Sequence, residues 1–227
     1  MKIVCMIPAR MGSKRIPNKN VRLLGGIPLI SHAIKAAKEA NCFDEIYVNS
    51  ESDTLGAIAL DEGVSFHKRP SSLSTDSATN DQFTEEFLHE VDCDYVIQLL
   101  PTSPFITAQE IKLFTERALE NKYDTLVSVK DNQIECVYKQ RPINFDQKKP
   151  SPPSQEVTPV QAYACTLMGW KKSNFLSNMN TYGCAYHGGE GRVKFLTVKG
   201  FCEIDIDHEE DFCMAEAVWS YLNERKN

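Results

Sequence analysis

A group of basic side chains near the N-terminus is the first feature of this sequence that could do chemistry. The segment IPARMGSKRIPNKN covers residues 7 to 20, directly behind a short apolar run. A guanidinium can bind phosphate oxygens through two parallel hydrogen bonds, a lysine ammonium acts as a mobile point charge, and a glycine lets the backbone approach a ligand closely. The segment is therefore suited to a phosphorylated ligand. Its basic residues, with one that follows closely, are Arg10, Lys14, Arg15, Lys19 and Arg22.

The basic segment contrasts with the charge of the whole chain. The formal net charge is -6, with 31 acidic against 25 basic residues. Such a field repels nucleic acid and anionic membranes, so we expect neither as a partner and expect a small anionic ligand instead. The alternative interpretation is that the basic residues of the segment belong to a solvated loop. The segment matches neither the GxxxxGK[ST] nor the GxGxxG phosphate-binding motif.

A pair of carboxylates near the C-terminus could complement these cations. In CEIDID, residues 202 to 207, alternation predicts a strand with Asp205 and Asp207 on one face and two isoleucines on the other. Two carboxylates suit Mg²⁺ held against nucleotide phosphates, as in phosphoryl and nucleotidyl transfer. The alternative is an amphipathic edge strand followed by an acidic helix start, HEED, that complements the helix dipole.

The elements that must position these residues alternate along the chain. The apolar patterns predict strands at 2–7, 45–50, 64–67, 94–100, 124–129, 162–170, 191–198 and 202–207, and helices at 28–40, 52–63, 79–91, 107–121 and 208–226. This order is typical of a three-layer, mostly parallel, Rossmann-like α/β sheet, whose ligands bind at the carboxyl ends of the strands. Residues 8 to 27 follow the first strand, so we expect them at that edge.

The length of 227 residues and the 42% hydrophobic content predict a single domain spanning residues 1–227. The segment at about 130–161 breaks the pattern with prolines and polar residues. It is either a disordered linker or an inserted arm that covers a ligand or reaches a second subunit. No apolar run is long enough to span a membrane or to serve as a signal peptide, and the eight cysteines form no CxxC pair. We therefore expect a cytoplasmic protein with reduced thiols.

Four motifs carry a resemblance to a known family. They are IPARMGSKRIPNKN (7 to 20), RPSSLSTDSATN (69 to 80), LPTSPF (100 to 105) and IDIDHEEDF (204 to 212). In order and spacing they resemble the CMP-sialic acid synthetases, or acylneuraminate cytidylyltransferases, over nearly the whole chain. The resemblance implies a nucleotidyltransferase that transfers CMP from CTP to an acidic, nonulosonate-like sugar and releases pyrophosphate. It also implies that the segment at 130–161 is exchanged between the subunits of a homodimer.

The resemblance also implies roles for particular residues. Arg10, Lys14 and Lys19 would bind the triphosphate, with Lys19 near the departing pyrophosphate, and Asp205 and Asp207 would hold Mg²⁺. Asp207 or a metal-bound hydroxide could accept the proton of the sugar hydroxyl, and the sequence does not select between them. The nucleotide would be held by Ala9, Gly12, Ser13 and Asn20 in the basic segment and by Arg69, Thr79 and Asn80 beyond it.

The chain departs from the family where the acceptor should bind. Leu100 and Ile106 stand where the family usually has glutamine and arginine, and Ala162, Ala164 and Cys165 lie where it tends to have an arginine and an Asn-Gly pair. The acceptor could thus be another nonulosonate, a smaller acid, a phosphonate or a sugar phosphate. A replacement cation could come from the 130–161 segment, although its charges could equally be solvated: Lys139, Arg141, Lys148 and Lys149. A same-fold enzyme for another nucleotide and a non-catalytic nucleotide-binding protein remain alternatives.

Overall fold

A seven-stranded sheet forms the centre of the computed structural model, which describes residues 1–120 and 122–224. All neighbouring pairs in this sheet are parallel except the two that involve β10. The prediction of a mostly parallel α/β sheet is therefore confirmed. In spatial order the strands are β11 (Val193–Thr197), β7 (Thr125–Asn132), β10 (Val160–Lys171), β6 (Tyr95–Leu99), β1 (Ile3–Pro8), β4 (Glu45–Ser50) and β5 (Ser65–Lys68).

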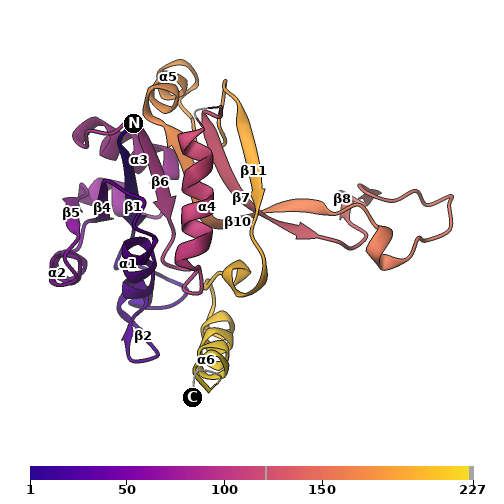
Figure 1. Cartoon of the computed structure of the whole chain (residues 1–227), viewed down its shortest axis with the longest axis horizontal. Helices are drawn as coiled ribbons and strands as arrows, with labels where there is room; N and C mark the ends of the chain where they lie inside the picture. Colours follow the sequence, from indigo (N-terminus) through magenta and orange to yellow (C-terminus); the bar gives the residue numbers. More distant parts are fainter. Residues whose placement is uncertain (121, 225–227) are drawn as a thin grey trace.

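Helices cover both faces of the sheet and complete three layers (Figure 1). One apolar cluster joins the sheet to α1 (Leu29–Ala40), α2 (Asp53–Asp61) and α4 (Ala108–Leu119), and a second joins its other face to α3 (Asn80–Glu90) and α5 (Lys172–Tyr182). Every residue of β1 is buried, because it lies between these two layers. Among the described residues, no helix combines the length and the apolar character needed to cross a membrane.

Local sequence signals set the ends of several helices. Ser52, Thr79 and Thr107 are the N-caps of α2, α3 and α4, and the last two form capping boxes with Gln82 and Glu110. These caps fix the loops that precede each helix at the carboxyl edge of the sheet. The predicted helix end at residue 121 and the last residues of the predicted C-terminal helix lie outside the described residues.

The C-terminal helix α6 (Glu209–Glu224) lies below the sheet in Figure 1 and packs on a small hairpin. That hairpin, β2 (Leu23–Leu24) and β3 (Ile27–Pro28), follows the basic segment and the 3-10 helix η1 (Lys19–Val21). Ile16, Ile206 and Phe212 form the centre of a third apolar cluster between them. The basic segment and the C-terminal acidic segment are thus packed together by apolar contacts close to their charged side chains.

One predicted element near the C-terminus was wrong, and one helix was missed. Residues 202–207 do not form a strand, because the 3-10 helix η4 (Gly200–Glu203) leads into an irregular segment whose Ile206 amide donates to the carbonyl of Thr102 at 2.9 Å. The carboxylates of Asp205 and Asp207 are therefore not placed by strand alternation. Helix α5 was not predicted, since its sequence KSNFLSNMNTY buries only Phe175 and Asn178 and has weak apolar periodicity.

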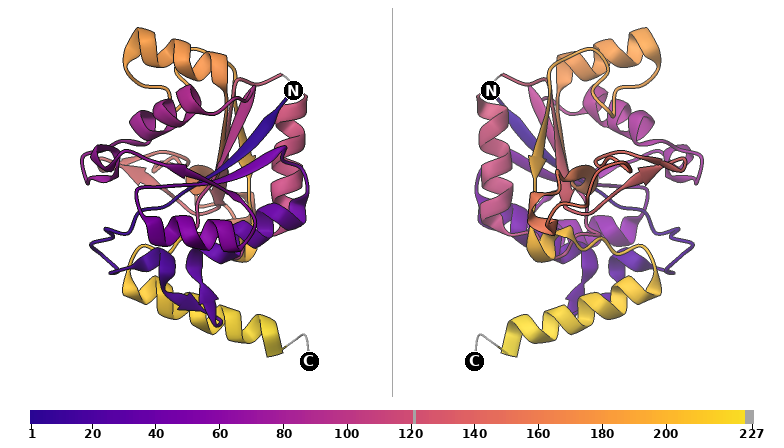
Figure 2. Two further views of the ribbon diagram at one scale, coloured as in Figure 1. Left: turned by 90° about the vertical axis from the view of Figure 1, so that its left-hand side faces the viewer. Right: turned by 90° about the vertical axis from the view of Figure 1, so that its right-hand side faces the viewer.

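The segment at 130–161 forms an arm that projects from the sheet (Figure 1) and is seen end-on in the two views of Figure 2. Its base is the antiparallel pairing of β7 with β10, which continues to Asn132 and Val160. Beyond it lie β8 (Val137–Tyr138), β9 (Arg141–Pro142) and the 3-10 helix η3 (Ser154–Glu156). The side chain of Asn144 joins three parts of the arm, because it accepts from the Cys136 amide and donates to the carbonyls of Ile134 and Thr158.

Candidate active site

The basic segment and the acidic C-terminal segment meet at the carboxyl edge of the sheet. The Lys19 ammonium donates to the carbonyl of Ile206 at 2.6 Å and lies 3.3 Å from Oδ1 of Asp207. The guanidinium of Arg15 reaches the same oxygen at 2.8 Å. The structure therefore brings together Lys19 and Asp207, as the sequence suggested, and adds Arg15, for which the motifs gave no role.

The other two predicted phosphate-binding cations share a different carboxylate. Arg10 donates to Oδ1 of Asp76 at 2.9 Å, and Lys14 forms an ion pair with the other oxygen. The hydrogen bonds from Lys14 and Arg10 lower the pKa of Asp76, so it stays ionised. Asp76 belongs to the RPSSLSTDSATN motif, but nothing in the sequence indicated that it contacts the basic segment. Its carboxylate is paired with Arg10 and Lys14, the two cations that an anionic ligand would need.

The remaining residues of the basic segment hold its backbone in place. The Ala9 amide donates to the Asn49 carbonyl at 3.0 Å, and the side chain of Asn20 donates to the Arg10 carbonyl at 2.9 Å. The side-chain oxygen of Asn20 is buried and has no partner among the described residues. Gly12 is exposed, with open space where a side chain would stand, and the Ser13 amide bonds the Met11 carbonyl. The backbone at Gly12 is thus accessible to a ligand, whereas the Ser13 amide already has a partner.

Arg69 lies beneath the basic segment rather than on its surface. Only 4% of the residue is exposed, its guanidinium bonds both the side chain and the carbonyl of Asn49, and it lies over the ring of Phe83 at 4.2 Å. Burial lowers its pKa to about 10, against the opposing charges of Glu51 and Glu86. Arg69 therefore supports the floor of the site in this structure.

The two other predicted nucleotide-binding residues lie at the start of α3. The Thr79 hydroxyl accepts the Gln82 amide, so its first role is to cap the helix, and Asn80 is exposed. Asp81 fixes a loop that follows α5, because its Oδ1 accepts from the amides of Ala185 and Tyr186. The helix start thus links the predicted nucleotide side of the site to the loop beyond α5.

The carboxylates of Asp205 and Asp207 fit the requirements of Mg²⁺. Burial of Asp205 raises its pKa, and the charge of Asp207 adds to the effect, while a hydrogen bond with Thr102 opposes it. A divalent cation would relieve this repulsion. Among the described residues, no three His, Cys, Asp or Glu side chains form a metal-binding group. Two carboxylates are nevertheless sufficient where a nucleotide's phosphates and water complete the coordination shell, as is common for Mg²⁺.

The residues that depart from the family lie in different environments. Ile106 is 5% exposed in the apolar cluster under α1 and α4, whereas Leu100 is half-buried at the end of β6. Ala162 and Cys165 lie on β10, and the register of β10 against β7 shifts between Tyr163 and Met168. Cys165 has a φ of 54° within this irregularity, a conformation uncommon for residues other than glycine. The strand is therefore deformed at the edge of the site.

Two aromatic residues and a histidine line the side of this deformation. Nδ1 of His187 lies 3.3 Å from the hydroxyl of Tyr163, and Tyr186 stacks edge-on against His187 with ring centroids 5.2 Å apart. Burial raises the pKa of Tyr186, and the charges of Cys165 and Asp205 contribute. No sequence motif indicated this group, because its members come from β10 and from the loop after α5.

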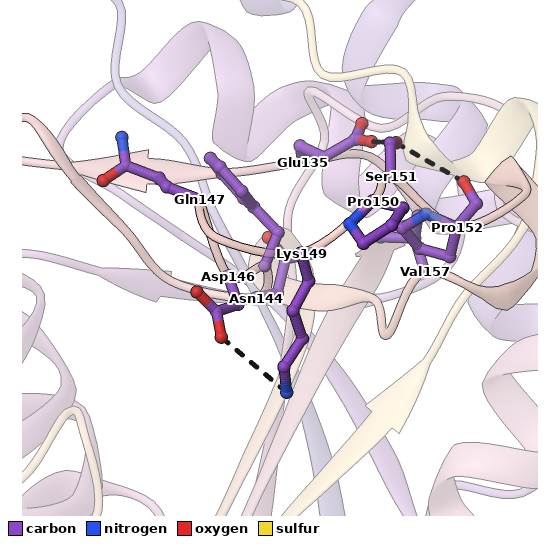
Figure 3. Close-up of a pocket in the computed structure, with 10 residues that line it drawn as sticks. Glu135, Asn144, Asp146, Gln147, Lys149, Pro150, Ser151, Pro152 and Val157 are labelled. Atoms are coloured by element: carbon purple, nitrogen blue, oxygen red, sulfur yellow. Dashed lines mark hydrogen bonds and ion pairs between the residues drawn. The ribbon is translucent and has the colours of Figure 1, made fainter.

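Within one chain, the basic side chains of the arm lie apart from the group formed by Tyr163, Tyr186 and His187. Lys149 is 3.7 Å from Asp146, at a depression of about 750 Å³ within the arm itself (Figure 3). Lys139 and Arg141 lie in the β8–β9 hairpin, and Arg141 is exposed. Since the arm points away from the sheet (Figure 1), these residues do not contact Asp205 or Asp207 of the same chain.

Comparison with known proteins identifies the family of this chain. The profile of a family described as cytidylyltransferase matches residues 4–178. An N-acylneuraminate cytidylyltransferase of Streptococcus agalactiae serotype III (strain NEM316) is 39% identical over 131 residues, 56% of this chain and 32% of that protein. One from Escherichia coli O18:K1:H7 (strain RS218 / NMEC) is 29% identical over 99% of this chain and 54% of its own length. The chain thus spans between a third and somewhat over half of these relatives.

A solved structure shows the same fold. CMP:2-keto-3-deoxy-manno-octonic acid synthetase complexed with CTP superimposes with a TM-score of 0.75 and 15% identity, covering 99% of this chain and 100% of that one. The fold is therefore an α/β nucleotidyltransferase fold. With the family profile matching most of the sequence, the chain belongs to the cytidylyltransferase family, as its motifs predicted.

Proposed function

We propose that this protein is a Mg²⁺-dependent cytidylyltransferase that transfers CMP from CTP to an acidic sugar and releases pyrophosphate. The observation that carries the proposal is the contact of both Lys19 and Arg15 with the carboxylate of Asp207 at the carboxyl edge of the sheet. Family membership and the N-acylneuraminate specificity named for both relatives support the choice of CTP and of a sugar acid.

The chain's own residues would act by holding and neutralising phosphates. The acceptor hydroxyl gives up its proton, which the Asp207 carboxylate could accept, and forms a bond to the α-phosphorus as the bond to the bridging oxygen breaks, so that pyrophosphate leaves with the charge. Lys19, whose side chain is 11% exposed, is held beside Asp207 and is preorganised for that developing charge. Arg10 and Lys14 would exchange Asp76 for the β- and γ-phosphates. Bound Mg²⁺ would supply further neutralisation, with Asp205 and Asp207 as its protein ligands.

We further propose that two copies of the chain form a homodimer through their arms. The arm carries apolar side chains that the other described residues leave largely uncovered, with Ile134, Val137, Tyr138 and Ile143 each more than half exposed. Exposed apolar groups on a projecting element are typical of an interface. Light scattering of the wild type and of Val137→Asp tests the dimer, and we expect a halved mass for the variant.

Eight free cysteines and a dependence on CTP favour the cytoplasm as the location of this protein.

Measurement of pyrophosphate release tests the proposed reaction. Each of CTP, GTP, UTP and ATP is supplied with Mg²⁺ and with a panel of nonulosonic acids, 2-keto-3-deoxy-octonic acid, sugar phosphates and phosphonates. We expect release with CTP and at least one sugar acid, and loss of release when the metal is chelated. Release with another nucleotide would identify a different nucleotidyltransferase, and nucleotide binding without release from any mixture would favour a binding protein.

A further inference from the structure

A row of four polar side chains leads from helix α3 to the base of the basic segment. The side chain of Asn49, fully buried on β4, lies at its centre. The Asn49 side-chain oxygen accepts from Nε of Arg69, and its nitrogen lies 2.8 Å from Nδ1 of His67, the residue opposite it on β5. Nε2 of His67 lies in turn 3.7 Å from Oε1 of Glu86 on α3. Only 10% of the His67 side chain is exposed.

The donors and acceptors of this row fix the protonation state of His67. A guanidinium can only donate, so the side-chain oxygen of Asn49 must face Arg69 and its NH2 group must face His67. Since that NH2 group can also only donate, Nδ1 of His67 must be an unprotonated acceptor. The proton of the neutral ring is then on Nε2, which faces Glu86. The row is complete only with this tautomer of the neutral ring.

The same row holds the start of the basic segment. The main-chain carbonyl of Asn49 accepts from two groups, the Ala9 amide at 3.0 Å and Nη2 of Arg69 at 2.8 Å. The guanidinium of Arg69 is thus bonded to both the side chain and the main chain of one residue. Its third nitrogen, Nη1, bonds none of the residues that the structure describes. The orientation of Asn49 therefore determines how Arg69 is presented beside Ala9.

We propose that His67 is a positioning residue for the nucleotide, and that protonation of its ring weakens the binding of CTP. The inference rests on the proposed function, because it takes CTP as the ligand of this site. An imidazolium carries a proton on Nδ1, so the Asn49 side chain would have to turn its oxygen toward His67. Its NH2 group would then face the Nε–H of Arg69, donor against donor. The buried guanidinium would lose its side-chain partner.

The groups around His67 set the pH range of this effect. Burial lowers the pKa of His67, the charge of Glu90 on α3 opposes this shift, and the charge of Arg69 adds to it. Glu86 faces Nε2, and the remaining neighbour, Phe87, is an apolar ring met edge-on at 5.1 Å. The ring is therefore neutral at neutral pH and becomes charged only below its ordinary pKa of 6.5. CTP should bind with full affinity above that pH and more weakly as the pH falls below it.

Calorimetry of CTP binding to two His67 variants and one control tests this role, with Mg²⁺ present and no acceptor. His67→Asn keeps an oxygen acceptor near the position of Nδ1 but cannot be protonated in this pH range, whereas His67→Leu fills the space without an acceptor. His89→Asn is the matched control, since His89 is exposed on α3. At pH 8 we expect His67→Leu to bind CTP about 10-fold more weakly than the wild type, and His67→Asn to bind within about twofold of it.

The pH profile distinguishes positioning from a merely structural role. The phosphates of CTP also titrate near pH 6, so the wild type is compared with His67→Asn at each pH and the titration of the ligand cancels. Between about pH 8 and about pH 5, we expect the wild type to lose at least about threefold in affinity relative to His67→Asn. His89→Asn should follow the wild type.

The outcomes separate this inference from the proposed function. If the wild type binds CTP and releases pyrophosphate, but His67→Leu keeps its affinity or the ratio to His67→Asn is the same at every pH, the inference is overturned and the reaction stands. Equal weakening in His67→Leu and His67→Asn, with a lower melting temperature in both, would show that the ring only fills space and would also overturn it. A wild type that binds CTP but releases no pyrophosphate with any acid overturns the proposed function, and the binding data still decide the role of His67. A wild type that binds no CTP overturns both.

Discussion

Lys19 and Asp207 are 188 residues apart in the sequence, and their charged atoms lie 3.3 Å apart at the carboxyl edge of the sheet. The ammonium of Lys19 also donates to the carbonyl of Ile206, and only 11% of its side chain is exposed. The contact joins the loop after the first strand to the segment before the last helix. It therefore lies at the centre of the candidate site and also connects segments from the two ends of the chain.

Lys19→Ala should reduce turnover by about two to three orders of magnitude, the effect of removing one preorganised group that stabilises developing charge. Because the side chain is largely buried and bonds Ile206, we also expect a destabilisation of about 1–2 kcal/mol in urea unfolding. Arg22→Ala is the control, since Arg22 pairs with Glu209 and lies 3.7 Å over the Phe212 ring. It should lose stability and keep its turnover. If Lys19→Ala and Arg22→Ala lose turnover in the same proportion to their loss of stability, Lys19 has a structural role only.

Asp207→Asn should abolish Mg²⁺-dependent pyrophosphate release, because one of two carboxylates at the metal site is removed. The side chain of Asp207 is 37% exposed, so the melting temperature should change little. Glu209→Gln is the control in the same acidic stretch, since its carboxylate contacts Arg22 instead. A Mg²⁺ titration of both variants provides the measurement. An unchanged metal dependence in Asp207→Asn would remove this residue from the site.

Arg15→Ala should lower the Mg²⁺ concentration for half-maximal activity. The guanidinium of Arg15 lies 2.8 Å from Oδ1 of Asp207 and competes with a cation for that oxygen. The side chain of Arg15 is 54% exposed, so the competition is worth at most about 1 kcal/mol, or roughly a fivefold change. A raised KM for CTP, with the Mg²⁺ dependence unchanged, would instead indicate that Arg15 binds the triphosphate.

The sequence predicted the strands and helices around this site better than the contacts between the residues of the site. Apolar runs and caps located β1, β4 and α3 within a residue or two, because a strand buried on both faces and a capped helix start are local properties. Alternation in IDID, however, indicated a strand that does not exist. The backbone of Ile206 is bonded to Thr102 and Lys19, and those partners come from distant segments.

The pairing of charges could not be predicted for the same reason. The motif containing Asp76 and the motif containing Arg10 are each visible in the sequence, but their contact depends on how β1 and the loop before α3 are placed by the sheet. Spacing along the chain carries no information about such pairs.

Asp76→Asn should strengthen binding of CTP and of inorganic tripolyphosphate, because it releases Arg10 and Lys14 from an internal anion. The ion pairs are exposed, so we expect an increase of only a few fold by calorimetry. The pKa of Asp76 is lowered below its ordinary value of 3.8, so Asp76 remains ionised at neutral pH. The ratio of the two dissociation constants should therefore be the same at pH 6 and pH 8. Weaker binding by the variant would show that Asp76 positions the cations instead.

Gln98→Leu should stabilise the protein. Gln98 is fully buried on β6, opposite Met6 and Met168, and neither of its amide atoms has a partner among the described residues. A buried polar group without a hydrogen bond costs about 1–3 kcal/mol, and a leucine of similar size removes that cost while filling the same space.

Asn49→Leu is the matched control for this change, because Asn49 is equally buried but its amide is bonded to Arg69 and His67. It should be destabilised by several kcal/mol, since the guanidinium of Arg69 would lose a partner in the interior. Urea unfolding of the two variants gives shifts of opposite sign if burial without a partner is the deciding feature. If Gln98→Leu is destabilised as well, and its activity falls, the Gln98 amide has a partner in the working enzyme. A bound water or the acceptor would then be that partner.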